Sequence, residues 1–164
     1  NPAIIAGTAQ AMQVQTGGER CGCGQIGLLE AIASGPAIAR AARLRLLSGE
    51  PSSMSRLPGS PDSVTTNDIG RAALQGDTLA RSVLEEAGRA IGRHLASLVH
   101  AFDPEVIVLG GGVSLIGPLF FEPIERAMRL HVMHPAYLEG LRLVPAELGV
   151  MNSTSTRCGT VAAR

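Results

Sequence analysis

The apolar residues of this chain recur mostly at helical spacing. The longest such run lies within residues 77–101, where they follow one another at steps of three and four: Leu84, Ala87, Ile91, Leu95 and Leu98. This spacing gathers them on one side of a helix, so the pattern predicts a long helix with one buried face. Asp77 is a suitable N-cap for it. The helix is expected to end at Asp103, because a residue that precedes a proline avoids helical backbone angles.

Shorter segments predict further helices. A short helix is expected over about residues 27–33, and Ser34 caps another that runs to about Leu47. Residues 48–63 are rich in proline and serine and are expected to form a surface connection. A cap at residues 66–68 predicts a helix that ends near residue 76, and the apolar positions of residues 119–128 predict an amphipathic one.

Strands are expected to be few and short. The run Glu105–Leu109 has the length of a strand and lacks polar alternation, so it is predicted to be an interior strand covered on both faces. Residues 141–144 predict a second short strand, residues 4–15 are partly extended in pattern, and residues 159–163 start a final helix. Helices combined with short buried strands indicate an α/β fold.

Composition narrows the possible classes of protein. Apolar residues make up 45% of the 164, yet the aromatic side chains are only three phenylalanines and one tyrosine. Small aliphatic side chains must therefore build the core, which favours helices packed on a sheet. The 14 basic residues equal the 14 acidic ones, so no basic stripe favours contact with nucleic acid. No apolar run approaches the roughly 20 residues of a membrane span, no signal peptide is recognised, and three cysteines fit a reducing cytoplasm.

The densest candidate chemistry lies in residues 21–30, which read CGCGQIGLLE. A loop rich in cysteine and glycine is typical of a metal site or a ligand pocket. Cys21 and Cys23 alone are a weak zinc signal, because a structural zinc ion is held by about four ligands. Glu30 follows at the start of the short helix. Its carboxylate is a candidate ligand contact, but a favourable interaction with the helix dipole explains it as well.

A second candidate is the glycine turn formed by Gly110, Gly111 and Gly112, directly after the predicted strand. Glycines at such a place let backbone N–H groups approach a nucleotide without obstruction by side chains. The run has neither the spacing of a dinucleotide fingerprint nor the lysine of a P-loop. Taken alone, the run is better explained as a tight turn between a strand and a helix.

Together these segments resemble the ROK family of repressors and sugar kinases. CGCGQIGLLE resembles the family's cysteine-glycine signature, and DPEVIVLGGGV (residues 103–113) resembles its adenosine-contacting strand and glycine turn. Residues 75–77 and 144–149 resemble further family segments in the same order. The resemblance implies an α/β fold: the C-terminal lobe of the actin-like, hexokinase-like (ribonuclease H-like) architecture, with a small mixed sheet flanked by helices. Residues 1–164 would then be a single domain, the C-terminal half of a ROK-type protein without the N-terminal nucleotide-phosphate lobe.

The resemblance also implies roles for individual residues. Glu30 stands where the family binds sugar hydroxyls, and Gly110, Gly111 and Gly112 stand where it contacts adenosine. The implied function is the sugar-binding and adenosine-contacting lobe of a glucokinase-like kinase, which uses ATP and Mg²⁺ on a hexose or an N-acetylhexosamine. The family's Asp-x-Gly-x-Thr phosphate loop is not found in these residues, so the lobe is not expected to act alone. The alternative is the catalytically silent effector domain of a sugar-responsive ROK repressor. A cytoplasmic homodimer is implied.

Three positions depart from the family pattern. Leu28 replaces the third signature cysteine, Ala11 replaces a histidine that binds zinc and sugar, and Thr8 replaces a sugar-binding glutamate. Cys21 and Cys23 are therefore expected to be the remnant of an incomplete zinc site. The sugar pocket loses acceptors for several hydroxyls, so sugar affinity is expected to be weak or altered.

Overall fold

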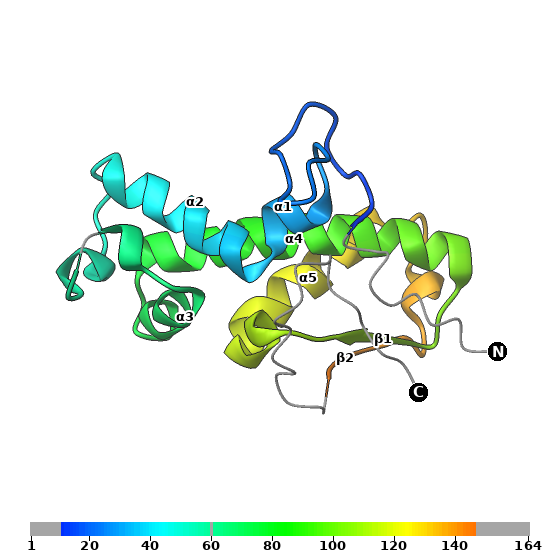
Figure 1. The fold of residues 1–164 in the computed structure, drawn as a ribbon. Coiled ribbons are helices and arrows are strands. Elements are labelled where there is room, and N and C mark those ends of the chain that lie inside the picture. The colour runs from blue at the N-terminus through cyan, green and yellow to red at the C-terminus, as the bar shows by residue number, and fades with distance from the viewer. Residues whose placement is uncertain (1–10, 60, 147–164) are drawn as a thin grey trace.

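The computed structural model describes residues 11–59 and 61–146 of the chain. Its helices and strands are α1 (Leu29–Ala33), α2 (Gly35–Leu47), α3 (Thr66–Leu74), α4 (Thr78–Phe102), β1 (Val106–Leu109), α5 (Pro118–His131) and β2 (Arg142–Pro145). Short 3-10 turns connect them: η2 (Ser53–Arg56), η3 (Pro61–Ser63), η4 (Gly112–Ile116) and η5 (Pro135–Leu138). Helix α4 runs lengthwise through the molecule, with α1 and α2 along one side and α3, α5 and the strands along the other (Figure 1).

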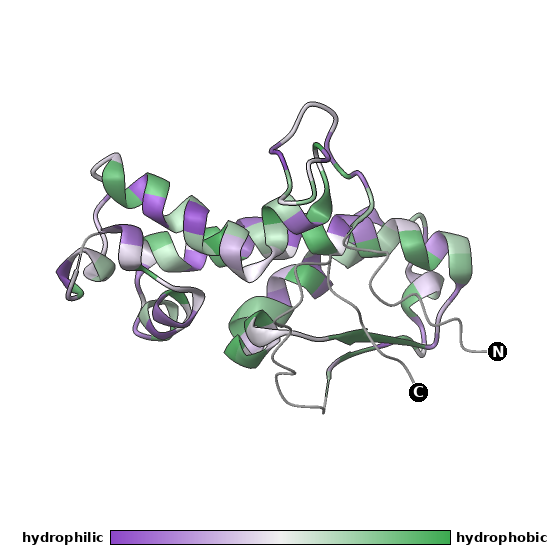
Figure 2. Cartoon of the chain, in the orientation of Figure 1, coloured by the Kyte–Doolittle hydropathy of each residue, from purple (hydrophilic) through white to green (hydrophobic). Residues whose placement is uncertain are grey.

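Helix α4 is the centre of the main core, as its apolar spacing predicted. All five residues of the predicted face are buried. Hydrophilic and hydrophobic residues alternate along α2 and α4 (Figure 2). Asp103 ends α4 in the left-handed conformation, with φ of 45°, and its N–H donates to the carbonyl of Val99 at 2.9 Å. Although α4 is long, none of the helices in residues 11–59 and 61–146 is apolar enough to cross a membrane.

Helices α4 and α5 pack closely because α4 carries two glycines on its facing side. A Cβ atom added to Gly88 would lie 2.7 Å from Cβ of Pro123. A Cβ atom added to Gly92 would lie 2.3 Å from the carbonyl oxygen of Ile124 and 2.7 Å from Cβ of Ala127. These separations are shorter than normal van der Waals contacts, so the observed spacing of the two helices requires glycine at both positions.

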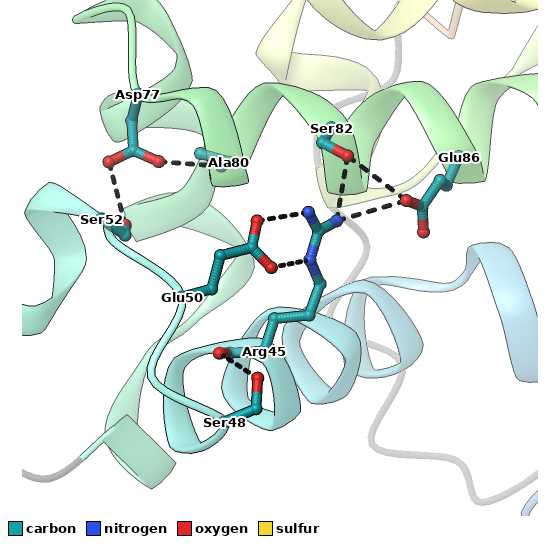
Figure 3. A network of polar contacts seen from close by, with 8 residues as sticks. All are labelled: Arg45, Ser48, Glu50, Ser52, Asp77, Ala80, Ser82 and Glu86. Atoms are coloured by element: carbon teal, nitrogen blue, oxygen red, sulfur yellow. Dashed lines mark hydrogen bonds and ion pairs between the residues drawn. The ribbon is translucent and has the colours of Figure 1, made fainter.

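Polar contacts fasten residues 48–63 to the start of α4 (Figure 3). Asp77 caps α4 by accepting from the N–H of Ala80 at 2.9 Å, and its other oxygen accepts from the hydroxyls of Ser52 and Ser53 at 2.9 and 2.7 Å. Arg45 donates to both oxygens of Glu50, at 2.7 and 2.5 Å, and also to Ser82 on α4. The predicted surface connection is therefore tied to the core by its side chains.

Asp77→Ala is expected to lower the free energy of unfolding by about 2 kcal/mol. The change removes the N-cap of α4 and leaves Ser52 and Ser53 without their shared acceptor. Urea unfolding followed by circular dichroism measures the loss. The control is Asp62→Ala in η3, where the carboxylate is exposed and a change within about 0.5 kcal/mol is expected. Equal losses in the two variants would contradict this role for Asp77.

The strands meet the sequence-based expectation only in part. β1 and β2 pair in parallel, with Val106 opposite Arg142, so the described strands form a small parallel sheet, and the mixed sheet expected for the whole lobe stays a prediction. β1 is hydrophobic (Figure 2), yet the Val108 residue is 49% exposed, so this strand is not covered on both faces. Strand composition reports β-propensity, whereas coverage of a face depends on which elements pack there.

Smaller differences concern the helix caps and the chain ends. Thr65, rather than a residue of 66–68, caps α3, and Asp68 completes a capping box by accepting from the N–H of Thr65 at 2.9 Å. Both Thr65 and Thr66 are acceptable cap residues, so composition alone does not separate them. The expected final helix at residues 159–163 lies outside the described residues.

Candidate functional site

Residues 11–28 form a loop that stands out from the helical body next to α1 (Figure 1). Two isolated antiparallel bridges close it, one between Gln13 and Leu28 and the other between Arg20 and Ile26. The N–H of Leu29 donates to the carbonyl of Met12 at 3.1 Å, which fixes the base of the loop to the first turn of α1. We call residues 11–28 the cysteine loop.

Gly27 is the junction of this loop. Its carbonyl accepts from the N–H groups of Val14 and Gln15 at 2.8 and 3.1 Å, and its own N–H donates to the carbonyl of Glu19 at 2.8 Å. Its φ is +73°, and a Cβ atom there would lie 1.7 Å from the Gln15 carbonyl oxygen. Sequence reasoning gave Gly27 no role of its own, although its fixed place in the Cys-x-Cys-Gly-x-x-Gly pattern was the available signal.

Glu30 lies in the first turn of α1 and is half-buried. Desolvation by burial raises the pKa of its carboxyl above the ordinary value. Within residues 11–59 and 61–146, no side chain forms an ion pair or a hydrogen bond with this carboxylate. A half-buried acid without a protein partner is a frequent property of ligand-binding sites.

The two cysteines of the loop lie in different surroundings. Cys21 is 7% exposed and packs with Leu28 and Ala31 in a small apolar cluster, while Cys23 is exposed. Leu28 and Ala11 both line a hollow of about 420 Å³, together with Gln13, Gly24, Gln25 and Ile26. Among the described residues, no group of three or more His, Cys, Asp or Glu side chains is arranged to hold a metal ion. The donors at hand do not fit the ligand set of a structural zinc.

The glycine turn follows β1 and opens to solvent. Gly110, Gly111 and Gly112 are exposed, and Cβ atoms added to Gly111 or Gly112 would meet nothing within 4 Å. Ser114 holds the turn, because its hydroxyl and its N–H both donate to the carbonyl of Gly111, at 2.7 and 3.1 Å. The turn thus presents backbone to solvent in a fixed conformation. Sequence reasoning missed Ser114, for which the sequence offered no signal.

The structure brings the α1–α2 junction next to the turn that follows the glycines. A Cβ atom on Gly35, the first residue of α2, would lie 3.5 Å from a methyl group of Val113 in η4. The hydroxyl of Thr66 also donates to the carbonyl of Gly35, at 2.8 Å. Glu30 lies one helical turn before this junction, so the acid and the glycine turn belong to neighbouring parts of the structure.

Comparison with known proteins places the chain in a family. The model of the ROK family matches residues 5–157. The chain belongs to the ROK family. The resemblance found in the sequence is thereby confirmed at the level of the family.

Two groups of ROK proteins are similar to this chain. The glucokinase of Thermotoga maritima is 32% identical over 146 residues, which are 87% of this chain and 46% of that protein. The DNA-binding transcriptional repressor Mlc of Escherichia coli is 38% identical over 125 residues, 76% of this chain and 29% of the repressor. The chain therefore spans less than half the length of either ROK relative.

A solved ROK structure matches the fold. The ROK glucokinase from Streptomyces griseus, solved in complex with glucose and AMPPNP, superposes with a TM-score of 0.75 at 34% identity. The match covers 84% of this chain and 45% of that structure. The mostly helical segment with a small parallel sheet is thus an arrangement found in ROK proteins.

Proposed function

We propose that this chain is the sugar-binding and adenosine-contacting lobe of a glucokinase-like ROK hexose kinase, with the C-terminal lobe of the actin-like, hexokinase-like architecture. In this proposal Glu30 binds sugar hydroxyls, and the turn Gly110–Gly112 contacts the adenosine. The observation that carries the proposal is the half-buried Glu30 carboxylate, which lacks a partner among the described side chains. The similarity to a glucokinase solved with glucose and AMPPNP supports it.

The chemistry of Glu30 suits a hexose. A carboxylate accepts hydrogen bonds from hydroxyl groups, and bonds to a charged acceptor are stronger than bonds between neutral groups. The carboxylate is partly desolvated and has no donor among the described residues, so a sugar hydroxyl would supply a partner. Ala11 has no polar side chain where the family pattern has a histidine, so fewer sugar hydroxyls are bonded and weaker discrimination between hexoses and N-acetylhexosamines follows.

The glycine turn suits the approach of a nucleotide. Its open Cβ directions leave room for a base or a ribose, and Ser114 keeps the turn in place. A kinase would bring ATP together with Mg²⁺, which neutralises phosphate charge during transfer. Phosphoryl transfer depends on groups that position both substrates, so we expect catalysis only where a phosphate-binding lobe is joined to this one. A homodimer in the cytoplasm remains a prediction from the sequence.

A second candidate is the effector domain of a sugar-responsive ROK repressor. The 38% identity with the repressor Mlc over 125 residues supports it. In that case the chain binds a hexose without needing a nucleotide. Titration with AMPPNP separates the candidates, because the kinase requires nucleotide binding at the glycine turn and the repressor does not.

Glu30→Gln is expected to weaken glucose binding at least about tenfold while the fold is kept. Isothermal titration with glucose and with N-acetylglucosamine measures the affinity. The matched control is Glu105→Gln, a change to an exposed carboxylate outside the cysteine loop, and it should retain hexose binding. Unchanged affinity in Glu30→Gln would contradict the proposed function.

The stability of Glu30→Gln gives an independent check. Because burial raises the pKa of Glu30 in the folded chain, the folded state holds this proton more tightly than the unfolded state. The stability that results is fully present below the unfolded pKa and is lost as pH rises through the folded pKa. At pH 7 the ionised Glu30 therefore costs stability, and Glu30→Gln is expected to melt at a temperature no lower than wild type. Loss of sugar binding in this variant would then not reflect unfolding.

A further inference from the structure

Main-chain hydrogen bonds hold the cysteine loop together. The two sides of the loop meet at Gly27, whose carbonyl and N–H form hydrogen bonds with three other residues of the loop. The tip is closed separately, because the N–H of Gly24 donates to the carbonyl of Cys21 at 2.9 Å and Arg20 donates to the carbonyl of Gly24 at 2.9 Å. None of these bonds requires a metal ion.

Beneath the loop lies the small apolar cluster of Cys21, Leu28 and Ala31, which are 7%, 6% and 5% exposed. Leu28 is the residue before α1, and Ala31 belongs to that helix. Cys21 packs here as a small apolar side chain. The cluster therefore joins the loop to the helix that carries Glu30, through side-chain packing that excludes water.

A third connection comes from α2. Arg40 donates to the carbonyl of Ala31 at 2.8 Å and pairs with the Glu19 carboxylate at 3.4 Å. One guanidinium thus spans the loop and α1. The described residues that line the hollow at Ala11 and Leu28 contribute carboxamides from Gln13 and Gln25 but no imidazole or carboxylate. Neutral amide and aliphatic groups are poor zinc ligands.

We propose that the cluster of Cys21, Leu28 and Ala31 anchors the cysteine loop without a metal, and that Leu28 is a positioning residue for Glu30. The part that concerns hexose affinity rests on the proposed function of Glu30. The anchoring itself does not, because the order of the loop is measured without sugar. Leu28 replaces a possible ligand by a side chain whose only contribution is packing, and that packing fixes the first turn of α1.

The test compares Leu28→Ala with the volume-conserving Leu28→Met and with Ile26→Ala, which shortens a 41% exposed side chain of the same loop. Leu28→Ala is expected to melt about 5 °C lower. It should also lose hydrogen-exchange protection at the amides of Val14, Gln15 and Gly27, and bind glucose about tenfold more weakly. Leu28→Met and Ile26→Ala should stay close to wild type in all three measurements.

Metal dependence is measured on the wild-type protein by elemental analysis, melting and hydrogen exchange, before and after dialysis against a chelator. Less than one zinc per chain, and loop protection that the chelator does not change, would support the proposal. Stoichiometric zinc together with a loss of loop protection on chelation would overturn it. Unchanged hydrogen-exchange protection of the loop in Leu28→Ala would also overturn the anchoring. Loss of that protection with unchanged glucose affinity would overturn the role of Leu28 in positioning Glu30. If wild type binds no hexose, the proposed function fails, while the exchange data still decide the anchoring.

Discussion

Gly92→Ala is expected to destabilise the protein by about 2 kcal/mol, although alanine favours helix more than glycine by about 1 kcal/mol. The added methyl group would lie 2.3 Å from the carbonyl oxygen of Ile124 and 2.7 Å from Cβ of Ala127. The first of these atoms belongs to the backbone of α5, so it cannot move aside by a change of rotamer. The two helices must separate, and side chains packed between them lose contact.

Urea unfolding of Gly92→Ala and of Ser97→Ala, on an exposed position of the same helix, isolates the packing effect. Ser97→Ala should change the free energy of unfolding by no more than about 0.5 kcal/mol. A Gly92→Ala protein as stable as wild type would mean that α4 and α5 do not pack as closely as the structure has them.

Gly27→Ala is expected to open the cysteine loop and to abolish measurable hexose binding. A left-handed φ costs alanine about 1 kcal/mol or more, and the methyl group would also lie 1.7 Å from the Gln15 carbonyl oxygen. No side-chain adjustment relieves that overlap, so the two sides of the loop must separate and lose their hydrogen bonds to Gly27. Hydrogen exchange at Val14 and Gln15 measures the opening, and titration with glucose measures the loss of binding.

Gly24→Ala is the matched control for this change. Gly24 lies on the same loop and has φ of +89°, but a Cβ atom there would meet nothing within 4 Å. It therefore carries the backbone strain without the overlap. We expect Gly24→Ala to keep the loop closed and to bind glucose nearly as well as wild type. Equal effects of the two substitutions would show that strain, rather than the overlap with Gln15, determines the behaviour of Gly27.

The helices were largely predictable because their signals are local. The apolar spacing of α4 and the cap at Asp77 are read within a few residues, and the structure has both. Ser34 likewise caps α2 by accepting from the N–H of Ala37 at 3.3 Å. A helix satisfies its backbone within one segment, so neighbouring residues decide most of its extent.

The environment of the strand was less predictable. The apolar run at Glu105–Leu109 was expected to be buried on both faces, but Val108 is 49% exposed. Pairing and coverage of a strand involve residues far away in the chain, such as Arg142 opposite Val106. Met54 shows the converse case, since it lies in a proline- and serine-rich connection yet is 3% exposed and packs in the main core.

In the candidate site, too, some features were predictable from the sequence and others were not. Residue types alone pointed to the cysteine loop, Glu30 and the glycine turn, and they identified the family that the comparison confirmed. The roles of individual residues in that site remain proposals. Gly27 was not recognised as a structural junction, because the carbonyl groups of Glu19 and Gln15 become its neighbours only after folding.

The sequence by itself determined the family, the main helices and the absence of three expected side chains, at Thr8, Ala11 and Leu28. These are properties of residue identity and short-range order. Only the tertiary structure decided that Leu28 packs with Cys21 and Ala31, that Glu30 is half-buried without a described partner, and that α4 approaches α5 through glycine. Burial and close approach depend on contacts between distant segments, and those contacts exist only in the folded chain.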